Sequence, residues 1–112
     1  MATFQQLDVY KRSIEFLALS QQILIGLPRG HGDLADQLRR AGQSVPLNIA
    51  ESEGRVGPAD KARTYAIARG SAMECLAILD VCRVLQVIEE PLYSRGNDLL
   101  DRVIAMLSKL CR

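Results

Sequence analysis

The chain has 112 residues, of which 48% are hydrophobic and 24% are charged, and its formal net charge is +1. This composition is typical of one globular domain and excludes a disordered or collagen-like chain, while the near-neutral charge excludes the strongly basic class of nucleic-acid-binding proteins. No apolar run is long enough to cross a bilayer, and the first residues lack the apolar stretch of a signal peptide. We therefore expect a cytoplasmic protein with no membrane association.

Apolar residues recur at helical spacing along four segments of the chain. The helices are expected at residues 4–25, 34–53, 58–86 and 90–111. At the start of the first, Thr3 and Gln6 have the spacing of a capping box. Asp33 is the expected N-cap of the second helix. Pro46 lies inside that helix and should kink it, because proline cannot donate the backbone hydrogen bond.

The third and fourth helices each begin with a proline, Pro58 and Pro91. Proline suits the first turn of a helix, where its missing N–H is not needed. No segment alternates apolar and polar residues with a period of two, so no strand is predicted. Four helices of similar length joined by short loops indicate an all-α fold. We expect an antiparallel up-down-up-down four-helix bundle, with residues 1–112 as a single domain.

A sector of polar side chains flanks the apolar stripe of the second helix, and polar residues of the third helix are expected to face it. Folding the two helices back on each other places Gly70 and Ser71 opposite residues 41–44, and Glu74 near Arg40. We expect a buried structural polar network in which Glu74 pairs with Arg40 and fixes the register of the helices. Its residues are Gln37, Arg40, Ser44, Asn48, Glu51, Ser71 and Glu74.

Residues that could carry chemistry are few. An active-site base at Glu51 or Glu74 is an alternative interpretation of the polar flank, but neither is accompanied by a nucleophile or a second orienting acid. The single histidine, His31, lies in a predicted loop, which excludes a di-iron bundle site. The three cysteines have no CxxC spacing and are expected as reduced core residues. We therefore expect no enzyme, no catalytic residue, no metal and no cofactor.

The chain carries two motifs, QLRRAGQSVPLNIAESEGR at residues 37–55 and IARGSAMECL at residues 67–76. They resemble the pattern QLRRAxxSIxxNIAEGxGR followed by IAxGSxxE, with Ser52 in place of a glycine. This is the pattern of small four-helix-bundle proteins encoded in intervening sequences of bacterial large-subunit ribosomal RNA genes. A related member is the nucleic-acid-binding accessory protein of diversity-generating retroelements. The resemblance covers nearly the whole chain and implies a four-helix bundle, a function unknown for most members, and a pentameric ring.

Two function classes remain after an enzyme is set aside. The first is an accessory protein that binds ribosomal RNA or other structured RNA or DNA. Residues 39–69 hold six basic and three acidic side chains, a local charge of +3. The tentative phosphate contacts are Arg39, Arg55, Lys61 and Arg63. The alternative is a protein–protein interaction scaffold that binds no nucleic acid, in which these side chains form internal ion pairs or a solvated face.

The third helix is apolar nearly all round, which predicts a homo-oligomer. One face is expected to fill the core of the bundle, with Ala66, Gly70, Ala77, Val81, Val84 and Ile88. The opposite face is expected to be covered by another subunit, because a bundle of this size buries one face of each helix. That predicted oligomer interface consists of Tyr65, Ala72, Leu76 and Leu79. A head-to-tail ring is compatible with two different faces, and the family resemblance implies a pentamer.

Overall fold

The computed structural model describes residues 2–112, and four long α-helices account for most of them. Their bounds are Asp8–Gly26 for α1, Gly32–Gly54 for α2, Pro58–Val84 for α3 and Glu90–Leu110 for α4. A short 3-10 helix, η1, precedes them at Thr3–Gln6. Residues 2–112 contain no strand, so the predicted all-α class is confirmed.

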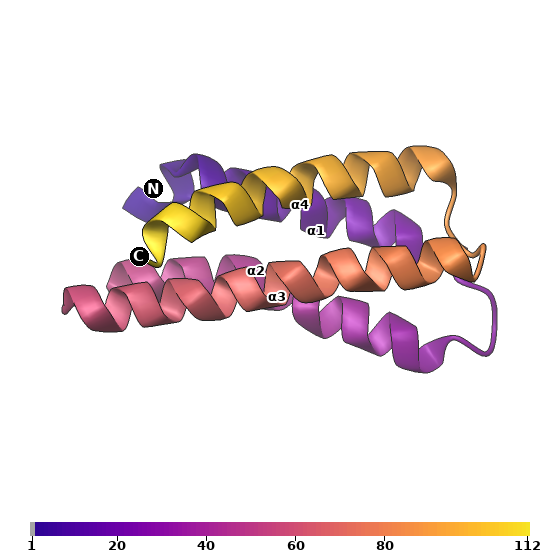
Figure 1. Cartoon of the computed structure of the whole chain (residues 1–112), viewed down its shortest axis with the longest axis horizontal. Coiled ribbons are helices and arrows are strands. Elements are labelled where there is room, and N and C mark those ends of the chain that lie inside the picture. The colour runs from indigo at the N-terminus through magenta and orange to yellow at the C-terminus, as the bar shows by residue number, and fades with distance from the viewer. Residues whose placement is uncertain (1) are drawn as a thin grey trace.

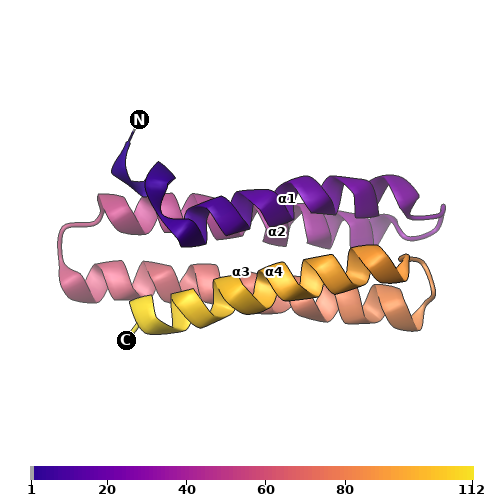
Figure 2. The ribbon, with the colours of Figure 1, turned by 90° about the horizontal axis from the view of Figure 1, so that it is seen from above.

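The four helices lie side by side in a bundle that measures 44 × 22 × 22 Å. Each helix runs back along the one before it, and α1 packs against α4 to close the arrangement (Figures 1 and 2). Helices α1 and α3 therefore occupy opposite corners of the bundle, as do α2 and α4. Every helix has one face toward the shared core and another toward the outside, where any interaction surface must lie.

The core is built from one apolar face of every helix. Its largest fully buried side chains are those of Tyr65, Phe16, Ile23, Leu38, Ile49, Leu79, Leu100 and Leu107. Cys75 and Cys82 are also buried there, Cys111 is half-buried, and all three are free, as expected of reduced core residues. Burial, helped by the nearby negative charge of Glu74, raises the pKa of the Cys75 thiol to about 12.

The capping box predicted at Thr3 and Gln6 is wrong by one residue. The side-chain oxygen of Gln5 accepts a hydrogen bond from the Ala2 amide at 2.8 Å. Leu7 then takes an extended conformation and separates η1 from α1. The first helical segment is therefore two pieces, and this break lets η1 fold beside the start of α1 and the C-terminal half of α2.

The N-cap of α2 lies two residues earlier than predicted. His31 is the N-cap residue, so Asp33 lies inside the first turn, where its charge still favours the positive end of the helix dipole. The helix continues through Pro46, which is buried. Figure 1 shows that α2 bends along its length, so that its N-terminal half diverges from α3, as a proline inside the helix predicts.

The two faces of α3 are the reverse of those predicted. Tyr65, Ala72 and Leu79, predicted at a subunit interface, are 1%, 0% and 0% exposed and lie in the core of the same chain. Leu76 is half-buried and packs against that core. The face predicted to fill the core is exposed instead at Ala66, Gly70, Ala77, Val81 and Val84, and Ile88 is half-buried in the loop beyond α3.

The physical reason for this reversal is side-chain size. Both faces of α3 are apolar, so periodicity alone does not decide which one turns inward. The large side chains of Tyr65 and Leu79 remove far more apolar area from water than Ala66, Gly70 and Ala77 can. The bulkier face therefore fills the core, and the face that combines Ala66, Gly70 and Ala77 with Val81 and Val84 lies outside.

Candidate interaction surfaces

The predicted polar network exists at the seam between α2 and α3, with fewer members than expected. The hydroxyl oxygens of Ser44 and Ser71 are 2.7 Å apart. The Asn48 side-chain amide donates to the Ser44 carbonyl oxygen at 2.8 Å and to its hydroxyl oxygen at 2.9 Å. Since Ser71 was expected opposite residues 41–44, these contacts confirm the predicted register of the two helices.

The predicted buried pair of Glu74 and Arg40 is wrong. Both residues are exposed, as is Gln37, and within residues 2–112 the two charges form no ion pair. At about 100° per residue, Glu74 is rotated away from the seam relative to Ser71. There its charge stays hydrated, which avoids the large cost of burying an ion pair.

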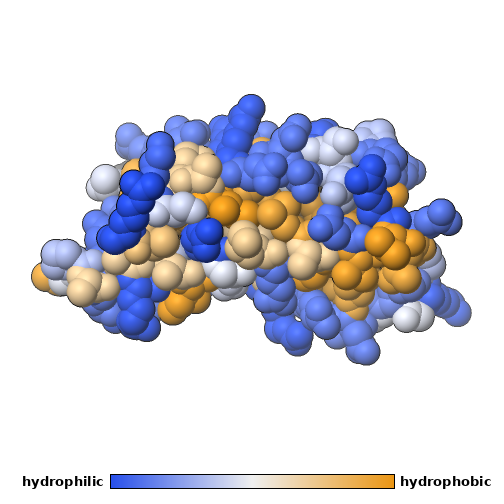
Figure 3. All heavy atoms as spheres, viewed as in Figure 1, coloured by the Kyte–Doolittle hydropathy of each residue, from blue (hydrophilic) through white to orange (hydrophobic). Residues whose placement is uncertain are grey.

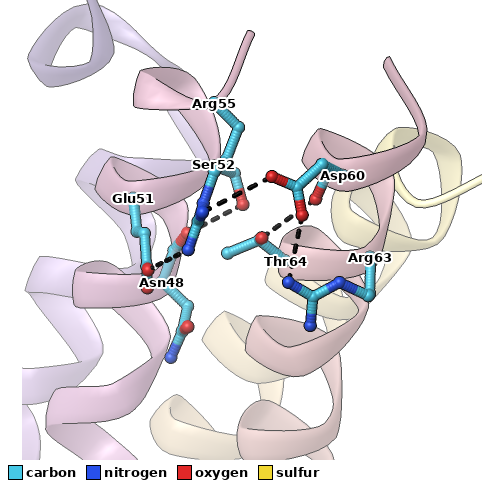
Figure 4. A network of polar contacts seen from close by, with 7 residues as sticks. All are labelled: Asn48, Glu51, Ser52, Arg55, Asp60, Arg63 and Thr64. Atoms are coloured by element: carbon cyan, nitrogen blue, oxygen red, sulfur yellow. Dashed lines mark hydrogen bonds and ion pairs between the residues drawn. The ribbon is translucent and has the colours of Figure 1, made fainter. Parts of the chain in front are cut away.

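Charged side chains converge where α2 ends and α3 begins (Figure 4). Arg55 lies 2.6 Å from a Glu51 oxygen and 3.4 Å from an Asp60 oxygen. Arg63 lies 3.0 Å from the other Asp60 oxygen. Asp60 therefore pairs with Arg55 across the turn and with Arg63 within α3, and Glu51 belongs to this cluster of ion pairs and not to the predicted polar network.

A second group of polar contacts lies beside this cluster, partly inside the bundle. The Tyr65 hydroxyl donates to Glu53, whose carboxylate is also 3.4 Å from the Lys61 ammonium. Burial raises the pKa of Tyr65 well above its ordinary value, and the hydrogen bond to the Glu53 carboxylate raises it further. The Glu53 carboxylate is therefore held by both Tyr65 and Lys61, and the charge of Lys61 has a partner of opposite sign.

All four tentative phosphate contacts have a carboxylate partner. Besides the pairs already described for Arg55, Lys61 and Arg63, the Arg39 guanidinium lies 3.0 Å from Asp36. Residues 51–63 hold three acids and three bases, and 3 − 3 leaves no net charge. A phosphate would have to compete with these internal partners.

The outer face of α3 carries exposed apolar side chains along its length, here called the α3 stripe. Three of its residues, Ile67, Met73 and Val81, are each 45% exposed, and Val84 is 81% exposed. Figure 3 shows apolar surface running along this helix on the face seen in Figure 1, interrupted by a few polar groups. The stripe consists of Ala66, Ile67, Gly70, Met73, Ala77, Val81 and Val84.

A second apolar surface lies where η1, α1 and α2 meet, and is here called the α1–α2 groove. Its volume is about 420 Å³, and it is lined by Phe4, Tyr10, Ile14, Leu17, Gln43, Pro46, Leu47 and Ala50. The rings of Phe4 and Tyr10 meet edge to face with centroids 5.1 Å apart, which holds η1 against α1. Leu47 is 65% exposed at the rim.

Sequence reasoning did not find this groove. Ile14 continues the apolar stripe of its helix in the sequence, and only the structure shows that it and Leu47 face solvent. The groove itself depends on the break at Leu7, which lets Phe4 fold back, and that break was not predicted.

Within the described part of the chain, neither a metal-binding group nor a membrane-spanning helix is found. Among residues 2–112, no three His, Cys, Asp or Glu residues are grouped so that they could hold a metal ion. None of the helices in that range combines the length and the apolar character that crossing a membrane requires.

Comparison with known proteins identifies relatives of the same fold. The crystal structure of a protein of unknown function from the S23 ribosomal protein family of Bacteroides thetaiotaomicron superposes with a TM-score of 0.84 at 23% identity, covering 93% of this chain and 98% of that one. No curated protein matches the chain. The model of the 23S rRNA-intervening sequence protein family matches residues 5–109. The shared bundle and this match over nearly the whole length lead to one conclusion: the chain belongs to the 23S rRNA-intervening sequence protein family.

Proposed function

We propose that this protein is a non-enzymatic helical bundle that assembles into a homo-oligomer through the α3 stripe and acts as a protein-interaction scaffold. The observation that carries the proposal is the exposure of that stripe. Single exposed apolar residues are ordinary on any protein surface, but a contiguous apolar patch marks an interaction site. The residues of the α3 stripe follow one another along a single face of one helix.

The composition of the α3 stripe also favours contact with another protein segment. From Ala66 to Val84 the helix rises about 27 Å, long enough for several turns of a packed neighbour. An added Cβ at Gly70 would meet no atom within 4 Å, so this position is open to the outside. Small residues at such positions let a second helix approach closely, while Ile67 and Met73 supply apolar area.

Self-association can be tested by placing charges on the α3 stripe. We expect the double variant Met73→Glu, Val81→Glu to remain helical and to be monomeric, because both positions are exposed in the single chain and two carboxylates would be desolvated in the assembly. The matched control is Ser94→Glu, Ala105→Glu, which adds the same charge at exposed positions of α4. Size-exclusion chromatography with light scattering measures the masses. A stripe variant that keeps the native mass would place the interface elsewhere.

Binding of structured RNA or DNA is the second candidate function. Arg40 is exposed and, within the described part of the chain, has no carboxylate partner, and Arg69 donates only to the Ser108 hydroxyl at 2.7 Å. In an oligomer, and in the pentamer that the family resemblance implies, several copies of these two arginines would be gathered in one particle. This repetition would compensate for the low charge of each chain.

Salt dependence separates the two candidates. Contact with phosphates should weaken steeply between about 50 and 200 mM salt, because each neutralised phosphate releases counterions. The measurement is fluorescence anisotropy of a labelled structured RNA and a DNA hairpin titrated with the protein at both salt concentrations. Absence of binding at the lower salt concentration would leave the protein-interaction scaffold as the remaining candidate function.

A further inference from the structure

We infer that residues 2–7, here called the N-terminal strap, form a conformational switch that pivots at Leu7. In one form the strap folds back beside α1 and α2, as the structure shows. In the other form it straightens into an extension of α1, which begins with the capping box of Thr3 and Gln6 that the folded-back form leaves unused. The switch operates within one copy of the chain and does not depend on self-association.

The backbone conformations of the two forms differ at a single residue. Residues 3–6 already form a helical turn, of the 3-10 type, and α1 continues from Asp8. Between them, Leu7 has a φ of −67°, close to the helical value, and a ψ of 134°, which is extended. Rotation of that ψ to about −42° continues α1 backwards through the strap, with only the small change from 3-10 to α geometry in residues 3–6.

The observed start of α1 lacks the groups that usually cap a helix. Its N-cap is Leu7, whose side chain makes no capping hydrogen bond. The amides of residues 8–10 have no backbone acceptor among residues 2–112. In the extended form these three amides donate to the carbonyl oxygens of residues 4–6. The free amides then lie at a new start, where Thr3 accepts a hydrogen bond and Gln6 reaches back to the N-cap amide.

The folded-back form is held by contacts that involve no buried residue of η1. The Phe4 ring lines the α1–α2 groove and meets the Tyr10 ring edge to face. The Ala2 amide donates to the Gln5 side-chain oxygen in an exposed hydrogen bond within the strap. The Asp8 carboxylate lies in the first turn of α1, where it favours the positive end of the helix dipole. The strap can therefore leave the groove without opening the core of the bundle.

Extension of α1 changes the α1–α2 groove. In a continuous helix, Leu7 lies three residues before Tyr10 and seven before Ile14, so the three side chains share one face. Because Tyr10 and Ile14 line the groove, Leu7 lengthens its wall on α1. The Phe4 ring leaves the groove at the same time. The switch thus converts a hollow that is bounded by Phe4 into a longer and more open one.

Hydrogen exchange of residues 8–10 distinguishes the two forms, because these amides gain acceptors only in the extended form. Phe4→Ala removes the ring that holds the strap, which favours the extended form by about tenfold or more. We expect exchange at residues 8–10 to slow by at least about twofold in this variant. Mass spectrometry of N-terminal peptides, in the cold at mildly acidic pH, measures the rates whatever the mass of the assembly. The matched control is Ile25→Ala, at a side chain 86% exposed at the other end of α1, which should leave these rates unchanged.

Thr3→Ala tests the capping box itself. Thr3 is exposed in the folded-back form, so this change alone should not alter exchange at residues 8–10. Combined with Phe4→Ala, it should restore most of the lost rate, since an N-cap residue favours a helix by about fivefold. Unchanged exchange in Phe4→Ala would overturn the switch, because the strap would then only fray. Slowed exchange that Thr3→Ala does not reverse would overturn the proposed extended form. Native exchange rates in peptides from α4 show that each variant is folded.

Discussion

Tyr65 links the turn between α2 and α3 to the core. Its ring is 1% exposed, and its hydroxyl donates to Glu53 at the end of α2. We expect Tyr65→Phe to lower the free energy of unfolding by about 1–2 kcal/mol, since a hydrogen bond to a charged group is lost while Glu53 keeps Lys61 and some water. The control is Tyr10→Phe, at a half-buried tyrosine with no hydrogen bond from its hydroxyl within residues 2–112, which should change stability by less than about 0.5 kcal/mol. Urea unfolding monitored by circular dichroism compares them, and equal values for the two variants would contradict this role of Tyr65.

The buried thiol of Cys75 makes stability depend on pH in the alkaline range. Its pKa is raised from 9.0 to about 12 by burial. Below pH 9 the thiol is protonated in both the native and the unfolded chain, so its stabilising effect is fully present. As pH rises from 9 toward 12, the unfolded chain loses a proton that the native chain retains, and the free energy of unfolding falls. Urea midpoints measured at increasing pH should therefore drop more steeply for the native chain than for Cys75→Ala, and identical slopes would show that the thiol is not responsible.

At the scale of the elements, Gly96 sets the distance between α4 and its neighbours. A Cβ at this position would lie 2.8 Å from the Leu79 side chain and 3.4 Å from that of Leu19. Because both leucines are buried, we expect Gly96→Ala to destabilise the chain by about 1–3 kcal/mol through overpacking.

The matched control for that change is Gly42→Ala, at a buried helical glycine of α2. Its Cβ would meet Leu17 at 3.5 Å, an ordinary contact, so the better helix propensity of alanine should stabilise the chain by up to about 1 kcal/mol. Thermal unfolding of both variants gives the comparison. We expect the two changes in stability to have opposite signs. If both variants lose stability, α2 packs against α1 as tightly as α4 packs against the core.

The sequence predicted the number, type and approximate bounds of the helices, because capping prolines and apolar periodicity are local signals. It also predicted the register of α2 against α3, which the contact of Ser44 with Ser71 confirms. It could not assign the faces of α3, since both are apolar and the choice depends on which side chains fill the core of the whole bundle. Nor could it predict that Asp60 pairs with Arg55 across the turn, because that contact exists only once the two helices are folded back.

At the scale of the whole molecule, the bundle combines a neutralised charged turn with two uncovered apolar surfaces. The ion pairs of Arg39, Arg55, Lys61 and Arg63 give each of these side chains a carboxylate partner with which a phosphate would compete. The α3 stripe and the α1–α2 groove leave large apolar side chains in water on different sides of the same small protein. Burying such surfaces between copies lowers the free energy of the assembly relative to separate chains.

The mass of the native chain in solution tests this conclusion most directly. Sedimentation velocity over a range of micromolar concentrations separates one copy, with a mass of 12.4 kDa, from larger particles. We predict a particle whose mass is a whole multiple of that value and which dissociates on dilution. A mass of 12.4 kDa at every concentration would contradict self-association through the α3 stripe.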